Sequence, residues 1–384
     1  MDFALSDEQQ LFQKAVRDFC ERELKPGAAH VDEQAQLNMA VVAKMPDLGL
    51  LGLQVPEEYG GADFDSVSAA IAIEELGRAC GSTGLSVAAH NGLCCFPIVQ
   101  WGTEEQKAAF LPRLTSGEVL GSLALTEPDA GSDLGGGVTT RAIKDGDCWV
   151  INGSKAWITN ASLAPVIVTL VRTNPEAGTH GFSMILVETD REGLHIAPPE
   201  KKMGVRGSPT HMLTFNDVRV PLDHLLGEEG CGLQQTLQTL DGGRIGIGAL
   251  AVGLAQAAFE EAVRYATERR AFGKTLAEHQ ATQFKLADAA MQIEAAQMLV
   301  YKAAWTKDRG ERFTRQAAMA KLFATETAER VAFEAIQIHG GYGYSREFPV
   351  ERIYRDQRLM TIGEGTSEVQ RMVIARRVLE EWGT

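Results

Sequence analysis

Hydrophobic residues in the first third of the chain, residues 1–120, recur at three- and four-residue spacing, which is typical of amphipathic helices. Ser6, with Gln9 three residues later, matches a capping box at the start of the first helix. The same spacing predicts further helices over residues 39–48, 65–77 and 83–101, and one capped by Thr103 that ends near residue 116.

The predicted helix over residues 83–101 is largely apolar and should be buried. His90 and Asn91 interrupt its apolar sequence. We interpret the two as hydrogen-bonded core groups, because most buried polar side chains have hydrogen-bond partners. A position facing a ligand cavity is the alternative.

From Gly121 onward, helical spacing gives way to alternating apolar and polar positions. The alternation predicts a strand and a tight turn within residues 149–155, and further short strands over residues 166–171, 182–187, 194–196 and 212–215. Several short strands at this spacing favour a small antiparallel barrel or sandwich.

Helical spacing returns after residue 226. Long helices with short connections predict an antiparallel bundle, with helices over residues 250–269, 283–305 and 314–338. We therefore predict an N-terminal helical domain over residues 1–120, a middle antiparallel β-barrel or sandwich over 121–225 and a C-terminal helical bundle over 226–384.

The bulk composition restricts the compartment and the partners. The 384 residues, 45% of them hydrophobic, suffice for two or three domains. A net charge of -14 argues against nucleic acid or an anionic membrane as a partner. The six cysteines match no zinc or haem spacing, so we expect no metal site and a reduced, cytoplasmic compartment. The acidic N-terminus is neither a signal nor a transit peptide, and no apolar run reaches membrane-spanning length, so we expect no membrane contact.

A single carboxylate, Glu364, lies between Gly363 and Gly365, where the missing side chains allow a sharp bend and close approach of a substrate. Just beyond, Ser367 and Gln370 form a capping-box pattern that leads into an apolar-periodic helix. A carboxylate beside a helix N-terminus and near apolar residues is a candidate general base. A solvated loop glutamate is the alternative.

Four other segments carry weaker signals for ligand binding. Residues 123–133 are rich in small and hydroxyl side chains, so their N–H groups and Thr126 could bond a flat heteroaromatic ring, and Ser132 could meet a phosphate or ribose. An ordinary polar loop is the alternative. Trp157 adds an aromatic side chain, which in a strand is usually a core residue.

Arg269 could hold a phosphate bidentately, although an ordinary ion pair is the simpler interpretation. The glycine-rich turn after Gln337, which includes Gly340 and Gly341, exceeds what a helix C-cap needs and favours close approach of a ligand. The chain lacks the signatures of a P-loop, a nucleophile elbow, a zinc-protease helix and a Rossmann dinucleotide site.

Six separated motifs occur along the chain: Leu125-Thr126-Glu127-Pro128-x-x-Gly131-Ser132-Asp133, Trp157-Ile158-Thr159-Asn160, Leu240-Asp241-Gly242-Gly243-Arg244, Arg269-x-x-Phe272-Gly273, Gln337-Ile338-x-Gly340-Gly341-x-Gly343 and Glu364-Gly365-Thr366-Ser367-Glu368. With these motifs the chain resembles the acyl-CoA dehydrogenase family over essentially its whole length, nearest to short-chain, butyryl-CoA-type bacterial members. The resemblance implies an N-terminal helical domain, a middle β-domain and a C-terminal four-helix bundle. It also implies one FAD per subunit, an acyl-CoA substrate and a homotetramer.

The resemblance further assigns roles to residues. Glu364 would remove the α-proton of the thioester while a β-hydride passes to the flavin, and the enolate oxygen would accept hydrogen bonds from the Glu364 N–H and a ribityl hydroxyl of FAD. The residues that would bind FAD are Leu123, Leu125, Thr126, Ser132, Trp157, Ile158, Thr159, Phe272, Thr366 and Glu368, joined from a neighbouring subunit by Arg269, Gln280, Gln337, Gly340 and Gly341. Those that would contact acyl-CoA are Ser132, Asp241, Gly242, Gly243, Arg244 and Gly365.

Two positions depart from common family patterns. Gly243 lies where some members carry the base, so Glu364 would act alone. Gly363 replaces a tyrosine common in straight-chain enzymes, which should leave room for branched or aryl-substituted acyl groups unless neighbouring side chains refill the space. We expect electrons to pass to an electron-transfer flavoprotein. An acyl-CoA oxidase on the same scaffold and a catalytically silent acyl-CoA-binding subunit are the alternatives.

Overall fold

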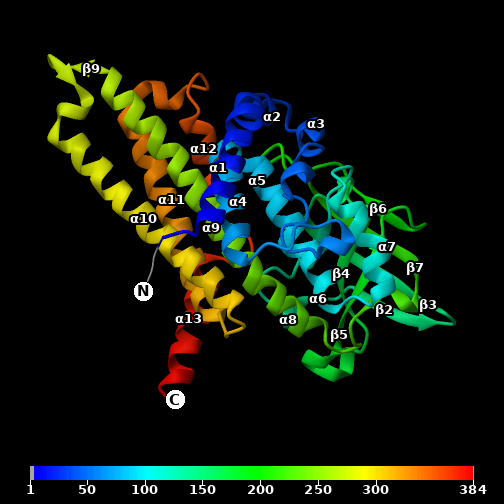
Figure 1. Cartoon of the computed structure of the whole chain (residues 1–384). Coiled ribbons are helices and arrows are strands. Elements are labelled where there is room, and N and C mark those ends of the chain that lie inside the picture. The colour runs from blue at the N-terminus through cyan, green and yellow to red at the C-terminus, as the bar shows by residue number, and fades with distance from the viewer. Residues whose placement is uncertain (1–3, 384) are drawn as a thin grey trace.

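The computed structural model describes residues 4–383, and it places a helical part, a sheet and a second helical part in chain order (Figure 1). The caps predicted at Ser6 and Thr103 are present, each with its partner glutamine three residues later. The N-terminal helices are α1 (Asp7–Phe19), α2 (Ala28–Gln34), α3 (Met39–Val42), α4 (Ser66–Ala79), α5 (Gly81–Ala89), α6 (Phe96–Trp101) and α7 (Glu104–Thr115).

Two predicted N-terminal helices are interrupted. The helix expected over residues 39–48 ends at Val42, and a separate 3₁₀ turn follows at Met45–Leu48, because Pro46 lacks a backbone N–H and restricts the residue before it. The helix expected over residues 83–101 consists of α5, a π-helix at His90–Cys95 and α6. Hydrophobic spacing shows neither break, since apolar residues continue through both.

His90 and Asn91 lie in this π-helix and are hydrogen-bonded core groups, as predicted. The Gly121 N–H donates to His90 Nδ1 at 2.7 Å, so His90 Nε2 carries the proton that it donates to the Leu51 carbonyl at 2.9 Å. The Asn91 amide accepts from the Leu53 N–H at 3.0 Å. The pair joins the N-terminal helices to the start of the sheet.

The middle part is one open, mixed sheet of eight strands in the order β6-β7-β3-β2-β4-β5-β8, with β1 beside β4. The predicted middle β-domain is confirmed, but its sheet is neither a closed barrel nor purely antiparallel, because β1 and β2 both pair with β4 in parallel. Alternation of residue types shows which faces are buried but not which strands are neighbours. The strands are β1 (Ser122–Ala124), β2 (Arg141–Asp145), β3 (Cys148–Thr159), β4 (Val166–Arg172), β5 (Phe182–Glu188), β6 (Leu194–Ile196), β7 (Thr210–Pro221) and β8 (Leu225–Leu226), with the short helix α8 (Leu134–Gly137) between β1 and β2.

The tight turn predicted within residues 149–155 is wrong, because β3 runs through all of them. The register of β3 against β7 shifts between Ile151 and Gly153. Gly153 has a φ of 147° and marks a β-bulge, which a glycine inside a strand often does.

The C-terminal part is a bundle around α9, which begins at Gly232 rather than near Leu250 and therefore includes Asp241 to Arg244. Beyond α9 the chain forms a small hairpin of β9 and β10 and then returns along α10 and α11 (Figure 1). The elements are α9 (Gly232–Glu268), β9 (Arg270–Ala271), β10 (Lys274–Thr275), α10 (Gln280–Asp308), α11 (Thr314–His339), α12 (Val350–Gln357) and α13 (Ser367–Glu381).

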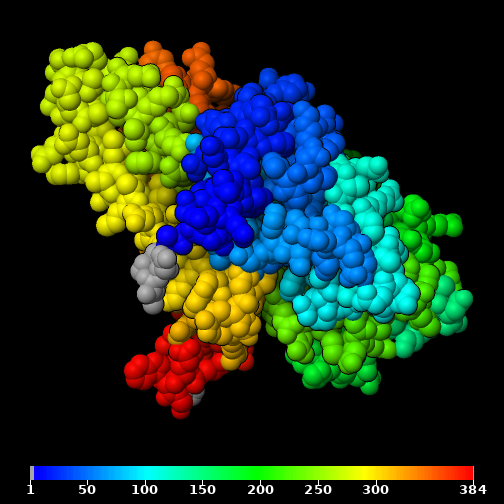
Figure 2. All heavy atoms as spheres, viewed as in Figure 1, coloured from blue at the N-terminus to red at the C-terminus, as the bar shows by residue number. Residues whose placement is uncertain are grey.

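The two helical parts share one apolar core. Ile71 and Leu76 of α4 belong to the same buried cluster as Leu250 of α9, and the N-terminal helices lie between the bundle and the sheet (Figure 2). A Cβ at Gly253 would lie 2.1 Å from the Glu74 carbonyl oxygen, so α4 and α9 cross with their backbones in close contact. The sheet has buried clusters of its own, one of which also includes residues of α6 and α7.

α9 contains an 18-residue window that is long and apolar enough to cross a membrane, although inspection of the sequence predicted no such run. Of that window, 67% is buried inside the protein. The apolar surface of α9 is therefore covered by the helices of the shared core.

Candidate functional site

The Glu364 turn, residues 358–366, connects α12 to α13. Glu364 and Gly365 both have a left-handed backbone, with φ of 54° and 92°. Such a conformation costs a non-glycine residue on the order of 1 kcal/mol and persists only where the surroundings hold it. Gln370 Nε2 donates to the carbonyls of Glu364 and Gly365, at 3.3 and 2.9 Å, and so holds the turn from the first turns of α13.

The cap of α13 differs by one residue from the prediction. Thr366, not Ser367, is the N-cap, and its side chain accepts from the Val369 N–H. Thr366 has the extended backbone that an N-cap needs, whereas Ser367 is already helical, and Gln370 is engaged with the preceding turn.

The carboxyl group of Glu364 is buried, which excludes the solvated loop glutamate. Its Oε2 atom has no hydrogen-bond partner among the described residues. Burial raises the pKa of Glu364 to about 7, and the positive charges of Lys321 and Arg244 act against that rise. A carboxyl group with such a pKa can both accept and release a proton near neutral pH.

Gly243 of α9 makes room for this carboxyl group. A Cβ at Gly243 would lie 2.0 Å from Glu364 Oε2 and 3.1 Å from Leu93 Cδ2. The Glu364 turn, α9 and the π-helix therefore meet at one point, and even one additional methyl group there would displace the carboxylate.

One residue further along α9, Arg244 is almost fully buried. Its guanidinium donates to Asp241 Oδ1 at 2.5 Å, and Asp241 Oδ2 accepts from the Thr314 hydroxyl, also at 2.5 Å. Burial raises the pKa of Asp241, while the bonds to Thr314 and Arg244 act to lower it. Asp241 thus joins α9 to the start of α11 behind the Glu364 turn.

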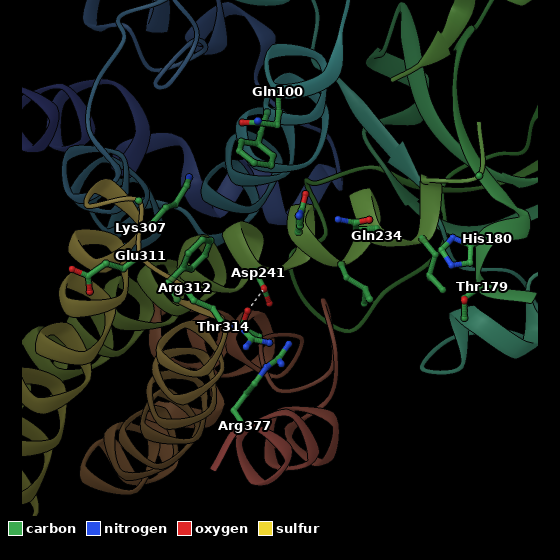
Figure 3. A pocket seen from close by; sticks show the side chains of 17 residues that line it. Gln100, Thr179, His180, Gln234, Asp241, Lys307, Glu311, Arg312, Thr314 and Arg377 are labelled. Atoms are coloured by element: carbon green, nitrogen blue, oxygen red, sulfur yellow. Dashed lines mark hydrogen bonds between the residues drawn. The ribbon is translucent and has the colours of Figure 1, made fainter. Parts of the chain in front are cut away.

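Asp241 also lines a pocket of about 950 Å³ between the sheet and the bundle (Figure 3). His180 lies on the sheet side, and Lys307, Arg312 and Arg377 lie on the bundle side, with Gln234 of α9 between the two groups. Four basic or imidazole side chains thus surround a pocket in an otherwise acidic protein. No pattern in the sequence indicates these four residues, because they come from separate segments without a shared motif.

A second group of predicted residues lies where β3 ends beside residues 123–127. The Ala156 N–H donates to the Thr126 carbonyl at 2.8 Å, and Lys155 Nζ donates to the Leu125 carbonyl at 2.9 Å. The structure thus brings two of the sequence motifs together. Leu123 and Leu125 are buried, whereas Ser132 is exposed on the loop that follows.

Lys155 and Glu127 form a buried ion pair directly behind this segment. Lys155 Nζ lies 3.0 Å from Glu127 Oε1, and the two side chains are 0% and 4% exposed. Burial acts to raise the pKa of Glu127, but Lys155 and the N–H groups of Thr139 and Thr140 lower it to about 2. The carboxylate is therefore ionised at neutral pH, and it joins β3 to the chain that leads into β2.

Trp157 is not the core residue that its place in a strand predicted. Its side chain is 62% exposed, and its φ is 61°. The register of β3 shifts between Lys155 and Ile158, which turns the indole outward. The Ile158 side chain is buried in the sheet, where Ile158 pairs with His211 of β7, and the Thr159 carbonyl accepts from the Ser122 hydroxyl.

Three domain models of one family match successive segments of the chain: the acyl-CoA dehydrogenase N-terminal domain over residues 6–118, the middle domain over 122–218 and the C-terminal domain over 230–379. The chain belongs to the acyl-CoA dehydrogenase family. It is therefore an FAD-dependent oxidoreductase, as the motifs predicted.

The chain is 54% identical over 381 residues to the probable acyl-CoA dehydrogenase YngJ of Bacillus subtilis (strain 168), covering 99% of this chain and all of the relative. The solved structure of butyryl-CoA dehydrogenase from Megasphaera elsdenii superposes with a TM-score of 0.96 at 44% identity, covering 99% and 100% of the two chains. A chain in a structure described as the electron transferring flavoprotein of Acidaminococcus fermentans has the same TM-score at 41% identity and the same coverage.

The residues near Trp157 fit an FAD cofactor. The exposed indole offers an aromatic face to a flavin ring, and Thr126 lies on the adjoining segment. Thr366 and Glu368 line a separate pocket of about 350 Å³, together with Arg358, Arg371 and two further carboxylates, Glu326 and Glu329.

The remaining predicted FAD residues lie at the opposite end of the bundle (Figure 1). Arg269 makes no ion pair within residues 4–383, so the ion-pair interpretation is wrong, and its guanidinium instead lies 5.7 Å from the Tyr342 ring centre. From Lys321 to Gln337, α11 rises about 24 Å at 1.5 Å per residue. Within one chain, these residues therefore lie too far from Glu364 to contact the same ligand atoms. The group comprises Arg269, Phe272, Gln280, Gln337, Gly340 and Gly341, and a pocket of about 590 Å³ includes Arg269 and both glycines.

Within residues 4–383, no group of three or more His, Cys, Asp or Glu side chains is arranged to hold a metal ion.

Proposed function

We propose that this enzyme oxidises a short-chain acyl-CoA to the trans-2-enoyl-CoA, with Glu364 as the base that removes the α-proton. The observation that carries the proposal is the buried carboxyl oxygen of Glu364, which lies over Gly243 and has no hydrogen-bond partner in residues 4–383. The butyryl-CoA dehydrogenase of Megasphaera elsdenii, at a TM-score of 0.96, supports the substrate class. A carboxylate placed in this way argues against a catalytically silent binding subunit.

The reaction explains what the turn must provide. A thioester α-proton is far too weakly acidic for a free carboxylate, so the charge that develops on the thioester oxygen needs a donor in place. The Glu364 N–H donates to no protein group among the described residues, so it can supply that hydrogen bond. FAD, when bound, supplies the hydride acceptor. The left-handed turn then has to hold the carboxylate and the N–H of one residue in a fixed relation to the substrate.

The pocket that Asp241 lines is the proposed place for the CoA arm. His180, Arg312 and Arg377 suit its phosphate groups, since guanidinium and imidazole N–H groups donate to phosphate oxygens. Asp241, Gly242 and Gly365 stay proposed substrate contacts. Arg244 is buried behind Asp241, so we propose that it acts through that residue.

We further propose that the enzyme is a homotetramer in which the group around Arg269 completes the FAD site of a neighbouring subunit. Its position at the far end of α11 supports this, as do exposed apolar side chains on the bundle. Met372 of α13 and Trp382 at its C-cap are 70% and 81% exposed, and α13 protrudes from the rest of the molecule (Figure 2). A second copy would cover these apolar side chains.

The acyl group is the least constrained part of the proposal. A Cβ at Gly363 would lie 3.7 Å from the Leu359 side chain, an ordinary contact distance, so a side chain would fit at this position and glycine leaves that space open. We therefore propose that branched and aryl-substituted acyl groups are accepted. Anaerobic addition of butyryl-, 2-methylbutyryl- and phenylpropionyl-CoA should each bleach the flavin band, and Gly363→Tyr should retain butyryl-CoA while losing the two bulkier substrates.

Bleaching by butyryl-CoA alone would contradict the wider specificity, and no bleaching by any acyl-CoA would contradict the proposed reaction.

We propose an electron-transfer flavoprotein as the acceptor, which the similar chain from the Acidaminococcus fermentans structure supports. Rapid reoxidation of the reduced enzyme by oxygen would instead indicate an acyl-CoA oxidase. The cysteines among the described residues are all free thiols, which supports the cytoplasm as the compartment.

Replacement of Gly243 by alanine tests the geometry of the base. The new methyl group would fall 2.0 Å from Glu364 Oε2 and displace the carboxylate, while alanine is well tolerated in a helix. We expect the bleaching rate to fall roughly 10- to 100-fold, since a misplacement of about 1 Å can cost as much. Gly246→Ala is the control, because its methyl group would lie 4.0 Å from its nearest neighbour, Ala88. Equal rates for the two variants would show that the carboxylate does not react from this place.

A further inference from the structure

A lysine from another helix reaches the Glu364 turn. Lys321 lies near the start of α11 and is fully buried, with 0% of its side chain exposed. Its Nζ donates to the Gly365 carbonyl at 2.6 Å, the same oxygen that accepts from Gln370. An ammonium group is costly to bury, so a lysine retained at this depth needs compensating partners. An ammonium group can donate three hydrogen bonds, and Lys321 Nζ donates one to the described residues.

The charges around Lys321 and Glu364 come from three helices. α11 contributes Lys321, α9 contributes Arg244, which is paired with Asp241, and α13 contributes Glu368. The π-helix contributes the apolar Leu93. Arg244 is already engaged by Asp241, so Lys321 is the cation near Glu364 that has no carboxylate bonded to it.

We propose that Lys321 is a positioning residue for the reaction: it holds the Gly365 carbonyl so that the Glu364 turn keeps its shape, and it places a buried ammonium group against that turn. The proposal rests on the function proposed above, in which Glu364 removes the α-proton. Because the Gly365 carbonyl belongs to the peptide unit that follows Glu364, a bond to it restrains the residue that carries both the carboxylate and the N–H donor. Lys321 needs no contact with the substrate.

The direction of the electrostatic effect follows from the surroundings of the carboxyl group. Burial raises the pKa of Glu364 to about 7, and Lys321 is the larger of the two cationic influences that oppose the rise. Removing the ammonium group should therefore move the pKa of Glu364 further upward. A base must be ionised to accept a proton, so the rate at neutral pH should fall and recover as the pH rises.

The test is the rate of flavin bleaching by butyryl-CoA between pH 5.5 and 9.5 in the wild type, Lys321→Met and Lys321→Arg. We expect the inflection for Lys321→Met to move upward by about one pH unit and the rate below it to fall about tenfold. Lys321→Arg should keep the inflection near that of the wild type. Lys302→Met, an exposed lysine on α10, is the control and should leave the profile unchanged.

A second measurement needs no turnover. The wild type and Glu364→Gln are labelled with ¹³C-glutamate, and their infrared spectra are subtracted. The difference reports the protonated carboxyl band of Glu364 directly. The same subtraction in the Lys321→Met background should show that band persisting to higher pH. If butyryl-CoA bleaches none of the proteins, the proposed function fails, but the infrared titration still decides the role of Lys321.

Three outcomes would overturn the proposal. One is a Lys321→Met enzyme that is slower at every pH with an unmoved inflection, because that behaviour marks a purely structural lysine. Another is an unmoved infrared titration. The third concerns folding: if Lys321→Met does not fold, the double variant Lys321→Met/Glu364→Gln should fold, since it removes both buried charges, and a double variant that also fails would show that packing alone requires the lysine.

Discussion

Glu364→Gln should retain the fold and the flavin but lose reduction by acyl-CoA by a factor of ~10²–10⁴, the usual contribution of a general base. The amide has nearly the shape of the carboxylate, so it should fit over Gly243 in the same place. It cannot accept the α-proton, so the proposed base is lost while the shape of the site is kept. The measurement is anaerobic stopped-flow bleaching of the flavin band by butyryl-CoA.

Binding has to be separated from chemistry in this experiment. The variant should still perturb the flavin spectrum when a non-reducible acyl-CoA is added, because the pocket that Asp241 lines is unchanged. Glu294→Gln is the control, since Glu294 is an exposed glutamate on α10. A Glu364→Gln enzyme that bleaches at the wild-type rate would show that another group removes the proton, and the proposed role of Glu364 would have to be given up.

Lys155→Met should lower the free energy of unfolding by about 3–5 kcal/mol, because it leaves a buried carboxylate without its cation. The Glu127 side chain is 4% exposed and keeps only its bonds to Thr139 and Thr140. The loss also frees the Leu125 carbonyl, which Lys155 holds at 2.9 Å. We therefore expect weaker FAD binding as well as lower stability, measured by chemical denaturation and by the flavin content after gel filtration.

The matched control is Lys144→Met on β2 of the same sheet. Lys144 pairs with Glu229 at the surface, where the two side chains are 53% and 41% exposed, and an exposed pair is worth about 0–1 kcal/mol. The double variant Lys155→Met/Glu127→Leu should recover part of the stability, since it removes the unpaired charge. A Lys155→Met protein as stable as the control would mean that water or a rearranged loop solvates Glu127.

Local sequence signals predicted the parts of the site that depend on neighbours along the chain. Glu364 between two glycines, and a helix starting just beyond, are such signals, and the helix start was wrong by only one residue because Thr366 has the extended backbone of an N-cap. The three-part architecture likewise followed from the change of periodicity at Gly121 and from the six motifs.

Contacts between distant segments could not be predicted in this way. Lys321 belongs to an ordinary helical pattern, and nothing around it in the sequence points to the Gly365 carbonyl. The parallel pairing of β1 with β4 depends on a chain crossing that strand alternation does not report. Trp157 was misplaced for a related reason, since the shift in register that turns its indole outward is a property of β3 and β7 together.

The common core of α4 and α9 affects how the polypeptide can be divided. Ile71 and Leu250 are fully buried in one cluster. In the sequence they are separated by the sheet, since the matched N-terminal family model ends at residue 118 and the C-terminal one begins at residue 230. A fragment starting at residue 122 would leave the face of α9 that crosses Gly77 open to water, so we expect it to aggregate rather than fold. The family models divide the chain into three segments, but we expect the helices of the first and the last segment to fold only together.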